Sequence, residues 1–233
     1  MTIIANTTPW LCEWIQPADN FHLLHYKNMP IQRQLQLEEE LLRSTQDNWF
    51  LINEGSPVTI VMGISGKADE LIELSLVEQD QIPILRRFSG GGTVIVDENT
   101  LFTTWICEKN RFPFPAFPEP IMRWIASVYK EALQHPQFAL RDNDFVIGER
   151  KIGGNAQYIK KDRWLQHTSF LWDYQPERMC YLKHPPKTPA YRAGRSHDAF
   201  LSRLMDHFED KEELVTSFKA AAHPRLLQTR QPS

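Results

Sequence analysis

Three successive glycines, at positions 90 to 92, lie between an arginine pair and a β-branched segment in the sequence RRFSGGGTVIVD of residues 86–97. Apolar residues precede the run, so we expect a sharp turn between two strands. Glycine has no Cβ, so a ligand can approach the bare backbone, and amides that line such a turn bind anions. Arg86 or Arg87 adds a guanidinium that can hold a phosphate or carboxylate. The run therefore predicts a phosphate-binding loop, with a tight hairpin and a solvated arginine pair as the alternative.

A second small-residue segment, GERKIGGNAQ of residues 148–157, contains Lys151. Small neighbours leave room for a ligand beside the ammonium group, although a lone lysine is more often a solvated surface cation. The next segment, KDRWLQHTSFLW of residues 161–172, has the pattern of a turn and a buried strand carrying His167. His167 is either a pocket donor or a hydrogen-bonded structural histidine. The two segments together indicate a ligand site, which neither would indicate alone.

The combination of RRxSGGGxVxxD, GxRKIxGxAQ and a following His-Thr strand resembles the motifs of the lipoate-protein ligase A family. These motifs are specific as a set and weak singly. The resemblance extends from about Gln34 to Tyr174. It implies an α+β fold in which mixed β-sheets are flanked by helices, the biotinyl/lipoyl-transferase catalytic domain, which is similar to class II synthetases. It also implies ATP-dependent activation of lipoate to lipoyl-adenylate and transfer of the lipoyl group to a lysine of a lipoyl domain.

The same resemblance assigns site residues. Lys151 is expected at the acyl carbonyl and the α-phosphate, and Asp144 is expected to orient Lys151 or to accept a proton from the attacking amine. The alternative for Asp144 is a turn-forming Asp-Asn-Asp run. Asn99 matches a family position near magnesium or phosphate. The residues expected to bind ATP or lipoyl-adenylate are Arg87, Ser89, Gly90, Gly91, Gly92, Thr93, Val94, Ile95, Asn99, Asn143, Gly153, Ala156 and His167.

By the resemblance, the cofactors are ATP and Mg²⁺, lipoate is the substrate, and no residue is assigned as a metal ligand. The expected partners are lipoyl domains of 2-oxoacid dehydrogenase E2 subunits or the glycine cleavage H protein. Octanoate and, on this fold, biotin are alternative acids. Only about sixty residues follow Tyr174, too few for the C-terminal accessory domain of many ligases. We therefore expect a short form of the family and consider a separate accessory polypeptide as a partner.

Two departures from the family pattern keep a non-catalytic binder of lipoate and nucleotide open as an alternative. Val96 stands where the family usually has a histidine, and Ser65-Gly66 replaces a glutamine-bearing motif. A further alternative is an ATP-independent octanoyl or lipoyl acyltransferase of the same fold, which needs an activatable thiol beside the lysine. The two positions that such a cysteine takes relative to Lys151 hold none here, and Cys180 is the nearest.

Composition agrees with one catalytic domain over residues 1–233, with the motifs in a core of about 31–208. A chain of 233 residues with 42% hydrophobic content can bury a sizeable core. The net charge of −3 argues against a nucleic-acid surface. No segment approaches the roughly 18 to 20 apolar residues that cross a bilayer, and no signal peptide is evident. The three cysteines lack CxxC spacing. We therefore expect a cytoplasmic protein without nucleic-acid or membrane partners.

Apolar periodicity predicts the individual elements. The expected helices are 31–43, 68–79, 121–134 and about 197–208. The expected strands include 49–52, 58–62 and 101–107, and residues 1–21 are expected to be irregular. The acidic triplet 38–40 is expected on the solvent side of the first helix.

Overall fold

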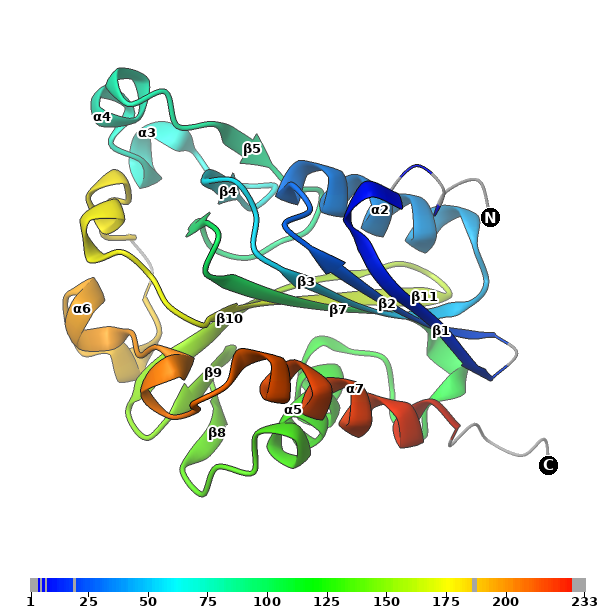
Figure 1. Ribbon diagram of the computed structural model, residues 1–233. Coiled ribbons are helices and arrows are strands. Elements are labelled where there is room, and N and C mark those ends of the chain that lie inside the picture. Colours follow the sequence, from blue (N-terminus) through cyan, green and yellow to red (C-terminus); the bar gives the residue numbers. More distant parts are fainter. Residues whose placement is uncertain (1–3, 5, 7, 19, 186–187, 228–233) are drawn as a thin grey trace.

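The computed structural model describes residues 4, 6, 8–18, 20–185 and 188–227. An eight-stranded mixed sheet forms the centre, helices cover both of its faces, and a three-stranded sheet lies beside it (Figure 1). The expected α+β class is confirmed. The strands of the large sheet, in spatial order, are β1 (Leu11–Ala18), β2 (Phe21–Lys27), β3 (Asn48–Glu54), β7 (Thr100–Glu108), β11 (Arg163–Leu171), β10 (Arg150–Ile159), β9 (Asp144–Ile147) and β8 (Phe138–Arg141).

The small sheet has the order β5 (Ile84–Arg86), β4 (Thr59–Met62) and β6 (Val94–Val96). Strand β4 is parallel to β5 and antiparallel to β6. Because β5 and β6 flank β4 and do not pair with each other, the glycine run cannot close a tight hairpin. The expectation of a sharp strand-to-strand turn is wrong: residues 87–93 form a loop that passes over the end of β4.

Apolar side chains pack against both faces of the large sheet. Helix α2 covers one face, and α5 and α7 cover the other (Figure 1). The helices are α2 (Ile31–Ser44), α3 (Ala68–Leu71), α4 (Leu74–Gln79), α5 (Pro118–Leu133), α6 (His197–Phe200) and α7 (Lys211–Leu227). The 3₁₀-helices are η1 (Thr8–Trp10), η2 (Lys109–Arg111), η3 (Pro176–Tyr181), η4 (Ala190–Arg192) and η5 (Leu204–Asp206). Within the described ranges, no helix is both long and apolar enough to cross a bilayer.

Strong helical periodicity identified α2 and α5 correctly, and weaker patterns did not. The predicted helix 68–79 is broken into α3 and α4, and the predicted helix 197–208 ends as α6 at Phe200. The expectation of irregular structure before residue 22 is wrong because β1 pairs with β2 along one edge of the sheet. Pairing across a sheet decides such a strand more than its own composition does.

Helix α7 was missed although its start carries a local signal. The side chain of Asp210 accepts hydrogen bonds from the backbone N–H groups of Glu212 and Glu213, at 2.7 and 3.2 Å. An aspartate before two glutamates is typical of a helix N-terminus. Burial of Leu214 and Phe218 against the α5 layer then stabilises the helix.

Candidate functional site

The glycine loop is organised by a buried arginine. The Arg87 guanidinium donates to the carbonyl oxygens of Gly92 at 2.8 Å, Gly90 at 3.1 Å and Val61 at 3.4 Å. Its side chain is only 6% exposed, and burial lowers its pKa to about 10, so it stays charged at neutral pH. The alternative of a solvated arginine pair is therefore wrong for Arg87. Arg86 also donates to backbone carbonyl oxygens, among them that of Ile64 after β4, at 3.0 Å.

Only one of the three glycines is required by backbone geometry. Gly91 has a φ of +115°, and a Cβ there would lie 2.6 Å from Nη2 of Arg87 and 3.1 Å from the carbonyl oxygen of Asn155. A Cβ at Gly90 or Gly92 would meet no atom within 4 Å. Gly91 therefore lies close against β10, at Asn155. The two flanking glycines border the cavity described below.

Replacing Gly91 by alanine should lower the free energy of unfolding by about 1–3 kcal/mol, because the left-handed backbone and the close approach to Arg87 both oppose a side chain. Urea denaturation measures the loss. Gly90→Ala is the matched control, since its Cβ enters open space. We expect it to leave stability unchanged or to raise it by about 0.4–1 kcal/mol. Equal destabilisation by both variants would contradict this account of the loop.

The predicted lysine and aspartate meet across the β9–β10 hairpin. The Nζ of Lys151 lies 2.8 Å from Oδ1 of Asp144, and the two side chains are 22% and 13% exposed. The Tyr191 hydroxyl donates to the other oxygen, Oδ2, at 2.9 Å. Burial and the nearby carboxylate raise the pKa of Tyr191, so the hydroxyl remains a donor. Asp142 does form a turn, with φ at +49°, but Asp144 uses its carboxylate to hold Lys151.

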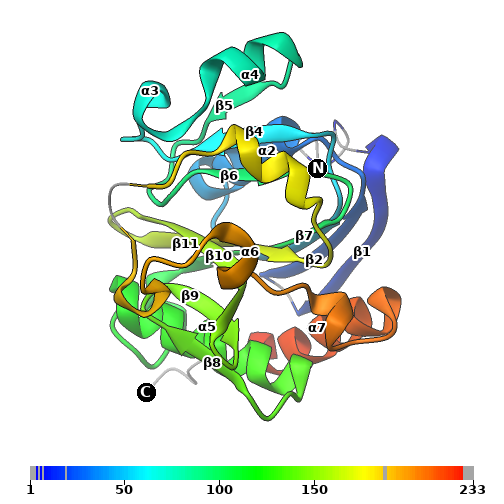
Figure 2. The same cartoon turned by 90° about the vertical axis from the view of Figure 1, so that its left-hand side faces the viewer.

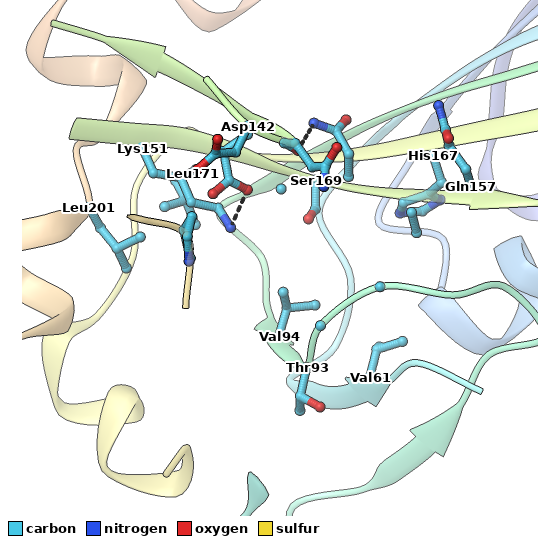
Figure 3. Close-up of a pocket in the computed structure, with 18 of the residues that line it drawn as sticks. Val61, Thr93, Val94, Asp142, Lys151, Gln157, His167, Ser169, Leu171 and Leu201 are labelled. Carbon is cyan, nitrogen blue, oxygen red and sulfur yellow. Dashed lines mark hydrogen bonds and ion pairs between the residues drawn. The ribbon is translucent and has the colours of Figure 1, made fainter. Parts of the chain in front are cut away.

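A cavity of about 1540 Å³ joins the glycine loop to the lysine hairpin. It exceeds the roughly 300–1000 Å³ of a drug-sized ligand site, so it can take a nucleotide and an acid together. In Figure 3, Lys151 and Ser169 face it from one side and Thr93 and Val94 from the other. One wall is an apolar cluster made by Ile31, Leu35, Val61, Val94, Val96 and Phe102.

Most of the predicted site residues line this cavity. They are Arg87, Gly90, Gly91, Gly92, Thr93, Val94, Ile95, Asn143, Asp144, Lys151, Ala156 and His167. Three others are not among the lining residues. Ser89 belongs to the loop but is only 1% exposed, and Asn99 lies in the turn between β6 and β7. Gly153 packs against Phe170, whose ring would lie 2.8 Å from an added Cβ. The neighbouring glycine, Gly154, is the one that makes room for the Lys151 side chain.

His167 lies on the cavity wall and also has a structural partner. Its Nδ1 is 2.9 Å from Oε1 of Glu38 on α2. The same oxygen accepts from Thr104 at 2.7 Å and from Gln34 at 2.8 Å. Glu38 is fully buried, so the expectation that the acidic triplet faces solvent is wrong at this position. Gln34 lies one turn away on α2, but Thr104 on β7 and His167 on β11 are distant in the sequence, and no local pattern predicts their hydrogen bonds to Glu38.

The sequence motifs predict no site residue after residue 189, although this segment completes the cavity. Arg192, His197, Phe200 and Leu201 line it. The backbone N–H of Ser202 donates to the carbonyl oxygen of Lys151 at 2.8 Å, and α6 lies against β10 (Figure 2). Burial, and next the charge of Arg192, lower the pKa of His197. The only available signal was a set of basic and aromatic residues after a proline-rich connection.

The positions of the cysteines bear on the acyltransferase alternative. Cys12 and Cys180 are exposed, and Cys107 is buried, where desolvation raises the pKa of its thiol. None of them is among the described residues that line the cavity. The described part of the chain also contains no group of three or more His, Cys, Asp and Glu residues able to hold a metal ion. Val96, at the family's histidine position, is 2% exposed and belongs to the apolar wall.

A family model described as the lipoyl protein ligase A/B catalytic domain matches residues 30–222. The chain belongs to this family, which confirms the resemblance of its motifs. It is 32% identical to the lipoate-protein ligase LplJ of Bacillus subtilis, over 70% of this chain and 49% of that protein. It is 27% identical to the inactive lipoate-protein ligase 2 of Plasmodium falciparum, over 62% of this chain and 47% of that protein. The chain spans about half the length of the curated relatives it matches.

Two solved structures share the fold. A crystal structure of lipoate-protein ligase A bound with ATP has a TM-score of 0.72 at 19% identity, and the match covers 90% of this chain and 87% of that one. A bi-partite lipoate protein ligase, studied with its E2 lipoyl domain from Thermoplasma acidophilum, also has a TM-score of 0.72 at 19% identity, covering 90% and 85%. At such identities the likeness establishes the architecture alone.

Proposed function

We propose that this protein is an ATP-dependent lipoate-protein ligase, which activates lipoate to lipoyl-adenylate and transfers the lipoyl group to a lysine of a lipoyl domain. The observation that carries the proposal is the Lys151 ammonium, held 2.8 Å from Asp144 on the wall of a cavity that the glycine loop also lines. The apolar cluster suits an acyl chain, and the loop suits a phosphate. The family membership of the chain supports the same activity.

In the activation step, a carboxylate oxygen of lipoate attacks the α-phosphorus of ATP. The bond from that phosphorus to the β-phosphate bridging oxygen breaks, and pyrophosphate leaves with the electron pair. Negative charge grows on the phosphate oxygens, so a fixed cation and amide donors lower the barrier. Lys151 supplies the cation, and the backbone of the glycine loop supplies the surface that the phosphate approaches. ATP brings Mg²⁺ as its counter-ion, since Mg²⁺ binds mainly through substrate phosphates and a few carboxylates.

In the transfer step, the neutral amine of the acceptor lysine attacks the acyl carbonyl, the bond from that carbon to the phosphate oxygen breaks, AMP leaves with the electron pair, and the amine's proton is released to solvent. Lys151 holds the carbonyl and phosphate oxygens during both steps, and its effect is electrostatic and positional. Asp144 is a positioning residue in this scheme, because Lys151 occupies one of its oxygens and Tyr191 the other. That arrangement favours orientation of Lys151 over proton abstraction by Asp144.

The acceptors that we propose are lipoyl domains of 2-oxoacid dehydrogenase E2 subunits or the glycine cleavage H protein. Support comes from the bi-partite archaeal ligase of similar fold that was studied with its E2 lipoyl domain. The relative bound with ATP supports ATP as the co-substrate. The inactive relative from Plasmodium falciparum keeps a non-catalytic binder as the second candidate.

Pyrophosphate release separates these two candidates. We expect the protein, mixed with lipoate and magnesium-ATP, to release pyrophosphate and accumulate lipoyl-adenylate detectable by mass spectrometry. A binder would retain both ligands, seen by calorimetry, without forming either product.

Cys180→Ser should leave both activation and transfer unchanged, because the Cys180 side chain is exposed and is not among the described cavity-lining residues. The rate of lipoyl transfer from lipoate with ATP, and separately the rate of octanoyl transfer from an octanoylated carrier protein, check this. Loss of an ATP-independent transfer activity in the variant would favour the thioester mechanism instead.

A further inference from the structure

Arg192, at the end of η4, has an unused buried donor on the cavity wall. The residue is 4% exposed, its Nε donates to the carbonyl oxygen of Arg195 at 3.0 Å, and its guanidinium lies 4.9 Å from the ring centre of Phe200. The Nη2 atom is buried and has no hydrogen-bond partner among the residues that the structure describes. A buried charged donor left unpaired is costly, so its position on a cavity wall points to a ligand that completes it.

The ligand group must be an oxyanion, because a guanidinium has only donors. Burial lowers the pKa of Arg192, and the nearby carboxylate of Asp144 opposes that effect. Lys151, the partner of Asp144, lies at the same end of the cavity. The apolar cluster that includes Val61 and Phe102 borders the cavity elsewhere. An acid whose chain occupies the apolar wall therefore brings its carboxylate to Lys151, and a second, more highly charged group fits Arg192.

We propose that Arg192 binds the phosphates of ATP beyond the α-phosphate, the part that leaves as pyrophosphate. This inference rests on the proposed ligase function, and it assigns a further binding residue to the reaction. A planar guanidinium suits phosphate oxygens, which it can hold through two parallel hydrogen bonds. A site shared by Lys151 and Arg192 also matches a polyphosphate better than it matches a single carboxylate.

The position of Arg192 relative to Lys151 is held by two contacts. The Tyr191 hydroxyl binds Asp144 at 2.9 Å, and the N–H of Ser202 binds the carbonyl oxygen of Lys151 at 2.8 Å. The segment that carries Arg192 is therefore fastened on both sides to the hairpin that carries Lys151. Donors fixed in this way need no reorganisation when charge moves onto the leaving group.

Arg195 provides a matched control. It is also an arginine beside Phe200, with 5.4 Å between its guanidinium and the ring centre. Its Nε donates to the carbonyl oxygen of Arg192 at 3.1 Å and its Nη2 to that of Tyr191 at 2.8 Å. It is not among the described residues that line the cavity. Methionine at either position keeps the packing and removes the charge.

The test is isothermal titration of inorganic pyrophosphate into the wild-type protein and into Arg192→Met, Arg192→Lys and Arg195→Met, each checked for folding by circular dichroism. We expect Arg192→Met to weaken pyrophosphate binding by about tenfold or more, and Arg195→Met to leave it unchanged. Lipoate binding should be the same in all four proteins. Arg192→Lys keeps the charge without the fork, so we expect a smaller loss, and this variant decides the question if Arg192→Met does not fold.

Three results of the titration would overturn the assignment: a wild-type protein that does not bind pyrophosphate at millimolar concentration, a folded Arg192 variant that binds it normally, or an equal loss in Arg195→Met. These outcomes are separable from failure of the proposed function, because pyrophosphate binding needs neither lipoate nor turnover. If Arg192→Met loses pyrophosphate binding but the wild-type protein makes no lipoyl-adenylate, the phosphate site is supported and the proposed ligase function is contradicted. Unchanged adenylate formation and an unchanged KM for ATP in Arg192→Met would support the ligase function and contradict the phosphate site at Arg192.

Discussion

Lys151→Ala should reduce lipoyl-adenylate formation by about 10² to 10³-fold, the usual effect of removing one charge-stabilising group from an active site. The fold should survive, because Lys151 is partly exposed and Asp144 keeps the hydrogen bond from Tyr191. Pyrophosphate release with lipoate and magnesium-ATP measures the rate, and thermal unfolding measures the fold. Transfer from preformed lipoyl-adenylate should fall as well, since the same cation holds the carbonyl during the second step.

The control for this variant is Lys161→Ala, at an exposed lysine in the turn after β10. It removes the same charge and side chain from the same part of the chain, so it should leave both rates unchanged. A Lys151→Ala protein with wild-type adenylate formation would remove Lys151 from the mechanism. A variant that loses its cooperative melting transition would show that the lysine is structural.

Arg87→Lys should lower the free energy of unfolding by about 1–3 kcal/mol, although the charge is conserved. The Arg87 guanidinium donates to the carbonyl oxygens of Gly90, Gly92 and Val61, and the residue is only 6% exposed. A single ammonium group cannot make all of these hydrogen bonds. The glycine loop would then lose its fixed shape, and we expect adenylate formation to fall by at least about tenfold. Urea denaturation and the pyrophosphate assay measure the two effects.

Arg123→Lys is the matched substitution for stability, because its guanidinium is 72% exposed and pairs with Glu119 on the same helix. It should leave the free energy of unfolding unchanged. If Arg87→Lys behaves like Arg123→Lys, then Arg87 does not shape the loop.

The parts of the site that could be predicted from the sequence are those with local patterns. Glycines beside an arginine pair, and a lysine among small residues, indicate a phosphate loop and a ligand pocket without any knowledge of tertiary structure. The cavity brings Gly90 to Ile95 and Lys151 together as expected. Their catalytic roles, and those of Ser89, Asn99 and Gly153 away from the lining, stay predictions that only mutants can test.

The parts that could not be predicted depend on contacts between distant elements. Glu38 is buried because His167 and Thr104, from other strands, supply its hydrogen bonds. Arg192 reaches the cavity because its segment is tied to the Lys151 strand through Ser202. Strand β1 depends on pairing with β2. Periodicity reports which face of an element is apolar, and it does not report which polar groups meet across the fold.

The measurement that tests the central claim most directly is mass spectrometry of a purified lipoyl domain after incubation with this protein and lipoate, with and without magnesium-ATP. The ligase account predicts a lipoyl mass increase on the acceptor lysine that requires magnesium-ATP and disappears with Lys151→Ala. An acceptor that gains the acyl group from an octanoylated carrier protein without ATP, and gains nothing from lipoate with ATP, would contradict it.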